Sequence, residues 1–269
     1  MPDFLADIVA RVVEDVHREE YAAGLPLPSL EPRASLRTAI VEGRPNGSVV
    51  VEYKRISPGS PNPVLPGRSL DDFVRATERG GVAGYSCVAT RPRFDGSPKD
   101  VAELAAITKK PILFKDFVVG TRQLDVAVAT GSSAVLLIQR LERTGLLEAS
   151  IPDLTRAAHE RGLEVLLELY DPAEVPAARE VPADLYGVNA RDLETLTVDR
   201  HHAERTLEAA WEGGLTPLLG LSGIERPVDA RGYLDSGADG VLVGTAAARS
   251  PDPAAFLRSL LADPKEGRR

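Results

Sequence analysis

Apolar residues along the chain gather in eight short runs, which are flanked by turn-forming residues and separated by segments whose apolar positions recur at helical spacing. Runs that stay apolar at successive positions are typical of parallel strands, because these strands are buried on both faces. We therefore predict eight strands. They cover residues 48–54, 82–89, 111–117, 133–139, 164–170, 185–191, 216–222 and 240–246.

Helices are predicted between these strands. Ser69 can cap a helix over residues 70–79, and the Gly80-Gly81 pair would end it. Similar segments cover residues 121–130, 145–161, 172–180, 199–212, 227–236 and 253–262. Eight strand–helix units in one domain predict a (β/α)8 TIM barrel, in which reacting groups lie at the C-terminal ends of the strands. The alternative, an open doubly wound sheet, would need a glycine-rich dinucleotide loop after the first strand, and the sequence has none there.

Residues 1–47 precede the first predicted strand and form a predicted N-terminal helical extension. An amphipathic helix is expected near residues 3–22 and a short helix around 35–41, with a proline-rich turn at 25–32 between them. Because the amphipathic helix has an apolar side to bury, we expect the extension to cover an end of the barrel.

The barrel itself is predicted to span residues 48–262. Its first strand is followed by a long connection, residues 55–68, whose prolines and glycines favour a lid over bound ligand, although an ordinary surface loop is the alternative. Residues 263–269 are basic at their end and are predicted to be a flexible tail.

Polar side chains end several of the apolar runs. These residues are Glu52, Lys54, Lys115, Glu168, Asn189 and Arg191. An ionised side chain is costly to bury unless it has a partner or takes part in a reaction. Since the C-terminal ends of barrel strands lie on one face, the pattern predicts a cluster of reacting groups. Simple ion pairs, Lys54 with Glu52 and Lys115 with Glu168, are the structural alternative.

Composition narrows the class of protein. The 269 residues are 43% hydrophobic and can bury a large core, while the net charge of −8 argues against a general nucleic-acid-binding surface. Cys87 is the only cysteine and the four histidines lack ligand spacing, so no disulfide framework and no metal site are predicted. No apolar run reaches the roughly 20 residues of a membrane span, and no signal segment is recognisable. We expect a cytoplasmic protein.

Glycines at the last two predicted strands suggest a phosphate site. Ser222-Gly223 ends the seventh strand and Gly244-Thr245 the eighth. Barrels often bind phosphate there through backbone N–H groups, because glycine allows the main chain to approach the oxygens. The alternative interpretation is that these glycines only form tight turns.

Seven ordered motifs resemble a known family. They are EYKRISP at 52–58, FDGS at 94–97, PILFKDF at 111–117, VLLI at 135–138, GVNARDL at 187–193, SGI at 222–224 and LVG at 242–244. By these motifs the chain resembles indole-3-glycerol phosphate synthase, a carboxy-lyase of tryptophan biosynthesis. The resemblance implies that 1-(2-carboxyphenylamino)-1-deoxyribulose 5-phosphate is cyclised with loss of carbon dioxide and water and without a cofactor.

The resemblance also implies residue roles. Lys115 would be the general acid at the substrate carbonyl, Lys54 would assist binding and dehydration, and Glu168 would take or relay a proton. Glu52 would tune Lys54, from which it is two residues away on the same strand face. Asn189 and Arg191 would bind the hydroxyl and the anthranilate carboxylate, and the phosphate would be bound by Ser57, Ser222, Gly223, Gly244 and Thr245.

The sequence departs from the family pattern around the expected pocket. Strand 7 of the family normally ends Ser-Glu-Ser-Gly-Ile, and here Leu221 stands in place of the glutamate. Gly59 replaces a serine in the first loop, and residues 86–90 differ from the usual Ser-Val-Leu-Thr plus acidic residue. We expect either a weakened synthase or a paralogue with a different aryl substrate.

Three alternatives to the synthase therefore stay open. A paralogue could cyclise a related arylamino sugar phosphate in specialised metabolism. Lys115 could instead form a Schiff base in an aldolase, or the barrel could bind a phosphorylated ligand without catalysis. For every alternative the expected partner is a phosphorylated small molecule rather than nucleic acid or membrane, and the expected state is a monomer or weak homodimer.

Overall fold

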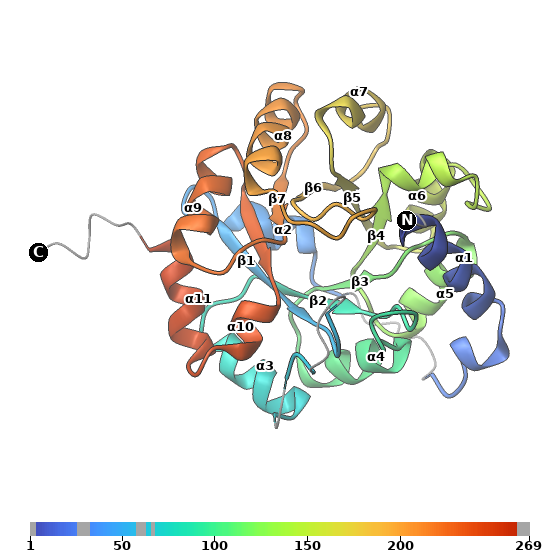
Figure 1. Cartoon of the computed structure of the whole chain (residues 1–269). Helices are drawn as coiled ribbons and strands as arrows, with labels where there is room; N and C mark the ends of the chain where they lie inside the picture. The colour runs from blue at the N-terminus through green and yellow to red at the C-terminus, as the bar shows by residue number, and fades with distance from the viewer. Residues whose placement is uncertain (1–3, 26–32, 58–62, 66–67, 263–269) are drawn as a thin grey trace, which may run out of the picture.

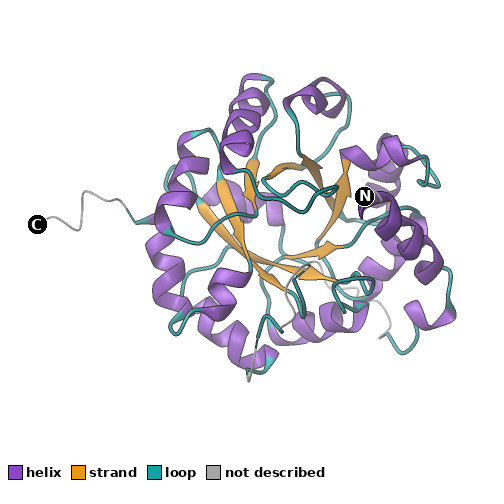
Figure 2. Ribbon diagram, in the orientation of Figure 1, coloured by secondary structure: helices purple, strands orange, loops and turns teal. Residues whose placement is uncertain are grey.

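The computed structural model describes residues 4–25, 33–57, 63–65 and 68–262. Eight parallel strands close into a barrel in the order β1 to β8, and helices surround it (Figures 1 and 2). The predicted (β/α)8 fold is confirmed. The strands are β1 (Ser48–Tyr53), β2 (Gly84–Val88), β3 (Ile112–Lys115), β4 (Ala134–Ile138), β5 (Glu164–Leu169), β6 (Leu185–Asn189), β7 (Leu218–Leu221) and β8 (Gly240–Val243).

Nearly every strand residue is buried, because one face of each strand packs inside the barrel and the other packs against the helices. Closure is made by β1, which pairs in parallel with both β2 and β8. Each strand falls within one predicted run and is shorter than it. The run predicted at 240–246 ends early, since Gly244 leaves the sheet and Thr245 begins a helix.

The outer helices match most of the predicted segments. They are α3 (Leu70–Glu78), α4 (Pro98–Ile107), α5 (Thr121–Ala129), α6 (Ile151–Glu160), α7 (Val175–Ala178), α8 (Arg200–Glu212), α9 (Pro227–Asp235), α10 (Thr245–Arg249) and α11 (Pro253–Leu261), with 3₁₀ turns η2 (Gln139–Thr144) and η3 (Pro172–Glu174). Ser69 caps α3 as expected, by accepting a hydrogen bond from the Asp72 backbone.

One outer helix was missed by the sequence-based prediction, and one predicted helix was wrong. Helix α4 was not predicted, although Ser97 caps it and Pro98 occupies its first turn, which are ordinary start signals. The segment 145–161 is not one helix, because Gly145 takes a left-handed conformation after η2 and Ser150 caps a new start at α6.

The N-terminal extension contacts both ends of the barrel, where one was expected. Its helix α1 (Phe4–Val16) ends earlier than predicted and is followed by η1 (Glu19–Tyr21). Helix α1 and η1 lie at the mouth of the barrel, the end where the strands have their C-termini. There the Tyr21 hydroxyl donates to Asp116 just after β3. Helix α2 (Leu36–Glu42) lies at the opposite end, behind the strands in Figure 1, and its first backbone N–H groups donate to Glu164 at the start of β5.

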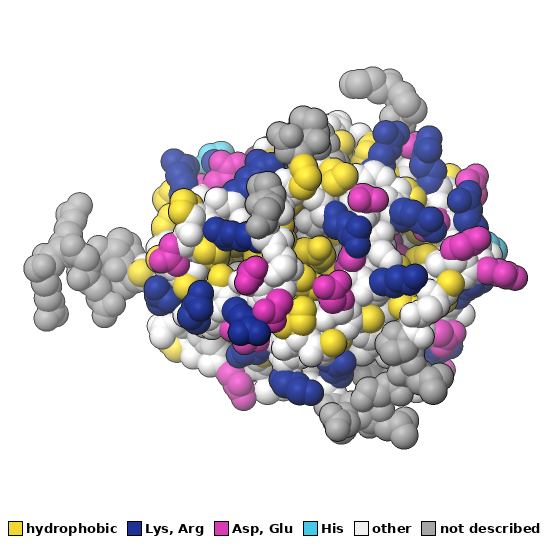
Figure 3. Space-filling view, turned by 90° about the horizontal axis from the view of Figure 1, so that it is seen from below, with side chains coloured by type: hydrophobic (Ala, Val, Ile, Leu, Met, Phe, Trp, Pro, Cys, Tyr) yellow, Lys and Arg dark blue, Asp and Glu magenta, His cyan; other side chains and the backbone are white. Residues whose placement is uncertain are grey.

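Several predictions fall outside the described residues. They are the tail at 263–269, most of the proline-rich turn at 25–32, and the part of the predicted lid at 58–62 and 66–67. Among the described residues, no helix is long and apolar enough to cross a bilayer. The face seen in Figure 3 carries basic and acidic side chains intermingled rather than one patch of a single sign.

Candidate active site

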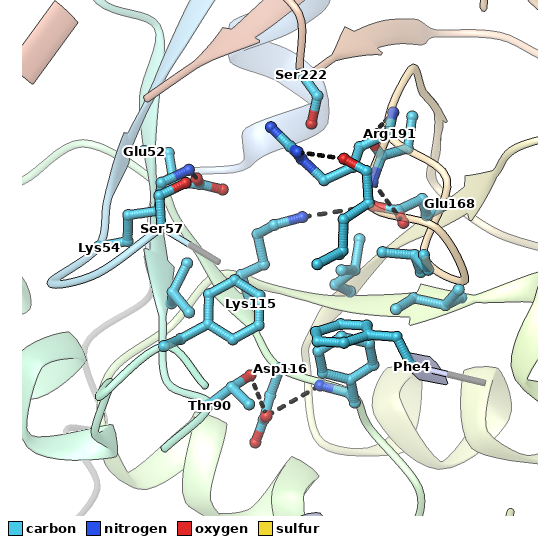
Figure 4. Close-up of a pocket in the computed structure, with 18 residues that line it drawn as sticks. Phe4, Glu52, Lys54, Ser57, Thr90, Lys115, Asp116, Glu168, Arg191 and Ser222 are labelled. Atoms are coloured by element: carbon cyan, nitrogen blue, oxygen red, sulfur yellow. Dashed lines mark hydrogen bonds and ion pairs between the residues drawn. The ribbon is translucent and has the colours of Figure 1, made fainter. Parts of the chain in front are cut away.

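The polar residues at the strand ends converge on one cavity at the barrel mouth (Figure 4). Lys115 is the last residue of β3, and Lys54 follows β1 directly. Glu168 lies in β5 and Asn189 ends β6. Because all strands run in the same direction, their C-terminal ends open on one face, and residues from distant parts of the chain line the same space. The structure thus brings together the predicted polar cluster.

Two ion pairs organise this cluster. Lys54 Nζ lies 2.7 Å from Glu52 Oε1, and Lys115 Nζ lies 3.4 Å from Glu168 Oε2. Asn189 Nδ2 donates to the other oxygen of Glu168 at 3.0 Å. The Glu168 carboxylate is therefore held on both sides, while the Lys115 ammonium has one long contact and extends into the cavity (Figure 4).

Charge rather than burial decides the protonation of this cluster. Burial alone would lower the pKa of Lys115, but the charges of Glu168 and Glu52 outweigh it and raise that pKa. Burial would likewise raise the pKa of Glu52, but Lys54 and Lys115 outweigh it and lower that pKa. At neutral pH the site therefore holds a protonated Lys115 beside an ionised Glu52, which is the state a general acid needs.

This charge state predicts how the free protein titrates. We expect the Lys115 ammonium to remain protonated up to at least its ordinary pKa of 10.5. Because the folded-state pKa lies above the unfolded value, the stability that this lysine contributes is complete below the unfolded pKa and is lost as pH rises through the folded pKa. NMR titration of the lysine side chains, assigned with Lys115→Gln, measures this. A Lys115 titration well below pH 10.5 would contradict the assignment.

Arg191 lies beyond the end of β6, not in it as predicted, and is fixed by its own loop. Its backbone N–H donates to Asn189 Oδ1 at 3.0 Å, and its guanidinium donates to the Leu196 carbonyl at 2.7 Å. Burial lowers its pKa, against the attraction of Glu52. The side chain nevertheless faces the cavity (Figure 4), where it can bind a carboxylate.

An apolar wall faces the charged cluster. It is formed by Phe4, Phe94, Phe117, Leu136, Ile138, Leu193 and Leu196. The ring centroids of Phe94 and Phe117 lie 6.3 Å apart and the ring planes are tilted by 46°, an arrangement that aromatic rings favour. These residues were not predicted as site residues, because apolar side chains of a helix, a strand or a loop that line a cavity cannot be distinguished from core residues by sequence. A flat aryl group fits such a wall.

Asp116, adjacent to Lys115, has a structural role: it connects segments of the chain through hydrogen bonds. Its carboxylate accepts hydrogen bonds from the side chains of Thr90, Tyr21 and Gln123 and from the Phe117 backbone. Burial raises its pKa, and these donors work against that effect. The hydrogen bond from Tyr21 connects the end of β3 to the N-terminal extension and thereby helps to position Lys115.

A crevice adjoins the cavity between the ends of β7 and β8. It contains four of the predicted phosphate residues, Ser222, Gly223, Gly244 and Thr245. The fifth, Ser57, lines the cavity. Arg200 and Arg249, which were not predicted as site residues, also line the crevice and add positive charge. The two spaces share Lys54, Lys115 and Arg191, so one ligand can extend from the apolar wall to the crevice.

Comparison with known proteins agrees with this geometry. The model of one family, described as indole-3-glycerol phosphate synthase, matches residues 5–260. The chain belongs to the indole-3-glycerol phosphate synthase family. A family protein of that name from Methanopyrus kandleri is 38% identical over 86% of this chain and 89% of its own length. Indole-3-glycerol phosphate synthase 2 from Streptomyces coelicolor is 34% identical over 90% of this chain and 88% of its own.

Solved structures also share the barrel. Thiamine phosphate pyrophosphorylase from Pyrococcus furiosus superimposes with a TM-score of 0.59, covering 84% of this chain and 96% of that one at 18% identity. At such low identity the match shows the fold alone. The sequence relationship, by contrast, places this chain in the synthase family.

The residue that departs from the synthase family pattern lies inside the barrel. Leu221 ends β7, is buried, and lines the crevice. A Cβ added at Gly187 would lie 2.8 Å from Leu221 Cδ1, so the leucine occupies the space above that glycine. Gly220 faces the other way, toward Tyr233 of α9. Room for a longer side chain at position 221 therefore comes from Gly187, not from Gly220.

Proposed function

We propose that this protein converts 1-(2-carboxyphenylamino)-1-deoxyribulose 5-phosphate to indole-3-glycerol phosphate, with loss of carbon dioxide and water. The observation that carries the proposal is the position of the Lys115 ammonium, which lies 3.4 Å from Glu168 where an apolar wall and a cationic crevice meet. Such a site suits a ligand with an aryl ring at one end and a phosphate at the other.

In the first step, the ring carbon that carries the carboxyl group attacks the ketone carbon of the sugar chain. The ketone oxygen gains negative charge and takes a proton from Lys115 Nζ. Loss of carbon dioxide from the ring carbon that made the attack then restores the aromatic ring. Arg191 can hold the carboxylate before it leaves, because its guanidinium already faces the cavity.

In the second step, the new hydroxyl leaves as water and the neighbouring carbon loses a proton, which forms the double bond of the five-membered ring and makes it aromatic. Lys54 lies at the mouth and is the proposed proton donor to the hydroxyl, while Glu168 is the proposed acceptor of the carbon-bound proton. The Asn189 side chain, which donates to Glu168, keeps that carboxylate aligned and can contact the hydroxyl. Glu52 holds Lys54 in place.

The direct experiment is an assay of indole-ring formation with the purified protein and the anthranilate-derived substrate. Indole fluorescence and mass spectrometry should show a product lighter by one carbon dioxide and one water. Tight binding of the substrate with no product would refute catalysis. Trapping of a Lys115 adduct by borohydride would instead support Schiff-base chemistry.

Gly244→Val tests the proposed phosphate site. A Cβ at this position would lie 3.0 Å from Glu52 Oε1 and 3.4 Å from Lys54 Nζ, so valine would narrow the crevice and crowd that pair. We expect the substrate KM to rise by about tenfold or more, and the inhibition constant of inorganic phosphate to rise with it. An unchanged KM would place the phosphate elsewhere.

We further propose that the protein acts in the cytoplasm as a monomer or weak homodimer, with the phosphorylated substrate as its partner. Light scattering across a range of concentrations tests the oligomeric state. A stable dimer at nanomolar concentration would contradict it.

A further inference from the structure

The turn that follows β7 has an unusual backbone. Ser222 has a φ of +64° and Gly223 a φ of +72°, so two successive residues take the left-handed conformation. Glycine adopts it freely, but for serine it costs energy, and such a residue persists only where its surroundings hold it. This same turn lines the crevice that is proposed to bind phosphate.

Tyr233 of α9 holds this turn from outside the barrel. Its hydroxyl donates to the Ser222 carbonyl at 3.0 Å, and its side chain is completely buried. A Cβ on Gly220 would lie 2.3 Å from Tyr233 Cδ2, so only a glycine there lets the ring lie against β7. Burial raises the pKa of Tyr233, and the hydroxyl therefore stays protonated and available as a donor at neutral pH.

The hydrogen bond has a consequence for the crevice. In a trans peptide unit the C=O and the N–H point in opposite directions. The Ser222 carbonyl points outward to Tyr233, so the N–H of the same unit, which belongs to Gly223, is directed away from the Tyr233 hydroxyl. Both residues of the unit line the crevice. A backbone N–H aimed in this way is a good donor to a phosphate oxygen.

We propose that Tyr233 is a positioning residue for the phosphate end of the substrate, acting by orienting the Ser222–Gly223 peptide. The identity of the full ligand rests on the proposed function, but the orientation of the peptide does not. Arg200 also stabilises this turn. Its Nη1 donates to the Gly223 carbonyl at 3.4 Å, and its Nε lies 3.5 Å from Asp229 Oδ1.

Tyr233→Phe tests the proposal, because it keeps the ring against Gly220 and removes only the hydroxyl. We expect the substrate KM to rise about three- to tenfold, the inhibition constant of inorganic phosphate to rise by the same factor, and kcat to change by less than about twofold. A matched control is Tyr186→Phe, which removes a hydroxyl that donates to the Val181 carbonyl at 3.2 Å, away from the crevice. The control should lose similar thermal stability without change in either constant.

Equal changes in both variants, or unchanged constants in Tyr233→Phe, would overturn the proposal. If the wild-type protein does not turn the substrate over, the proposed function fails separately. In that case a calorimetric titration with inorganic phosphate tests the role of Tyr233 independently of turnover. Weaker phosphate binding in Tyr233→Phe than in Tyr186→Phe would support it, whereas equal binding in both, or no binding by the wild type, would refute it.

Discussion

Replacing Lys115 by alanine is expected to lower kcat by about 10²- to 10⁴-fold while the barrel stays folded. The reason is chemical: the variant lacks the positioned acid that protonates the ketone oxygen, and the other ammonium at the mouth, that of Lys54, is paired with Glu52. The fold should persist because Lys115 lies at the open end of β3, and Glu168 keeps its hydrogen bond from Asn189. Steady-state kinetics measures the change in kcat, and circular dichroism measures whether the barrel stays folded.

Lys110→Ala is the matched control, since this exposed lysine precedes the same strand at the closed end of the barrel. It should leave kcat and stability nearly unchanged. If Lys115→Ala unfolds, Lys115→Gln separates the roles, because glutamine can still donate to Glu168 but cannot act as a general acid. Near-normal turnover by either Lys115 variant would make this lysine a structural ion-pair partner.

Replacing Leu221 by glutamate is expected to raise kcat on the anthranilate-derived substrate, by up to about 10²-fold. The family pattern has a carboxylate at this position, and leucine can neither accept a hydrogen bond nor move a proton. Leu221 shares the crevice with Lys115 and Arg191, so a carboxylate there would find cationic partners. Its side chain would extend over Gly187, where no Cβ obstructs it.

Leu221→Gln controls for shape, because it adds a polar group of the same size without the charge. Wild-type turnover should be low, and only the glutamate variant should gain markedly. The opposite result, robust wild-type turnover that falls when glutamate is introduced, would show that Leu221 is an adaptation within a working enzyme. A wild type that prefers another arylamino sugar phosphate would indicate a paralogue, in which the new carboxylate would be buried at a cost of several kcal/mol.

The order and type of the strands could be predicted from local pattern. Continuous apolar runs such as that around β4 indicate buried parallel strands, and eight of them with intervening helices leave few folds. Helices were harder to predict: α4 was missed, and the break between η2 and α6 was not foreseen, because a cap and a following glycine act over only a few residues. Residues such as Lys115 and Glu168 stood out because charges rarely end buried strands without a partner.

Other features depend on contacts that no local pattern contains. Lys115 meets Glu168 53 positions away, and Phe4 joins the wall of a cavity whose other sides come from the ends of several strands. A glycine gives space to Leu221 only if it faces the barrel interior. In the structure Gly187 faces the interior, whereas Gly220 faces the surrounding helices. The sequence by itself determined the strands, the fold and the reacting residue types. Barrel closure and strand register decided which of those residues touch, because these alone set distances between segments remote in the chain.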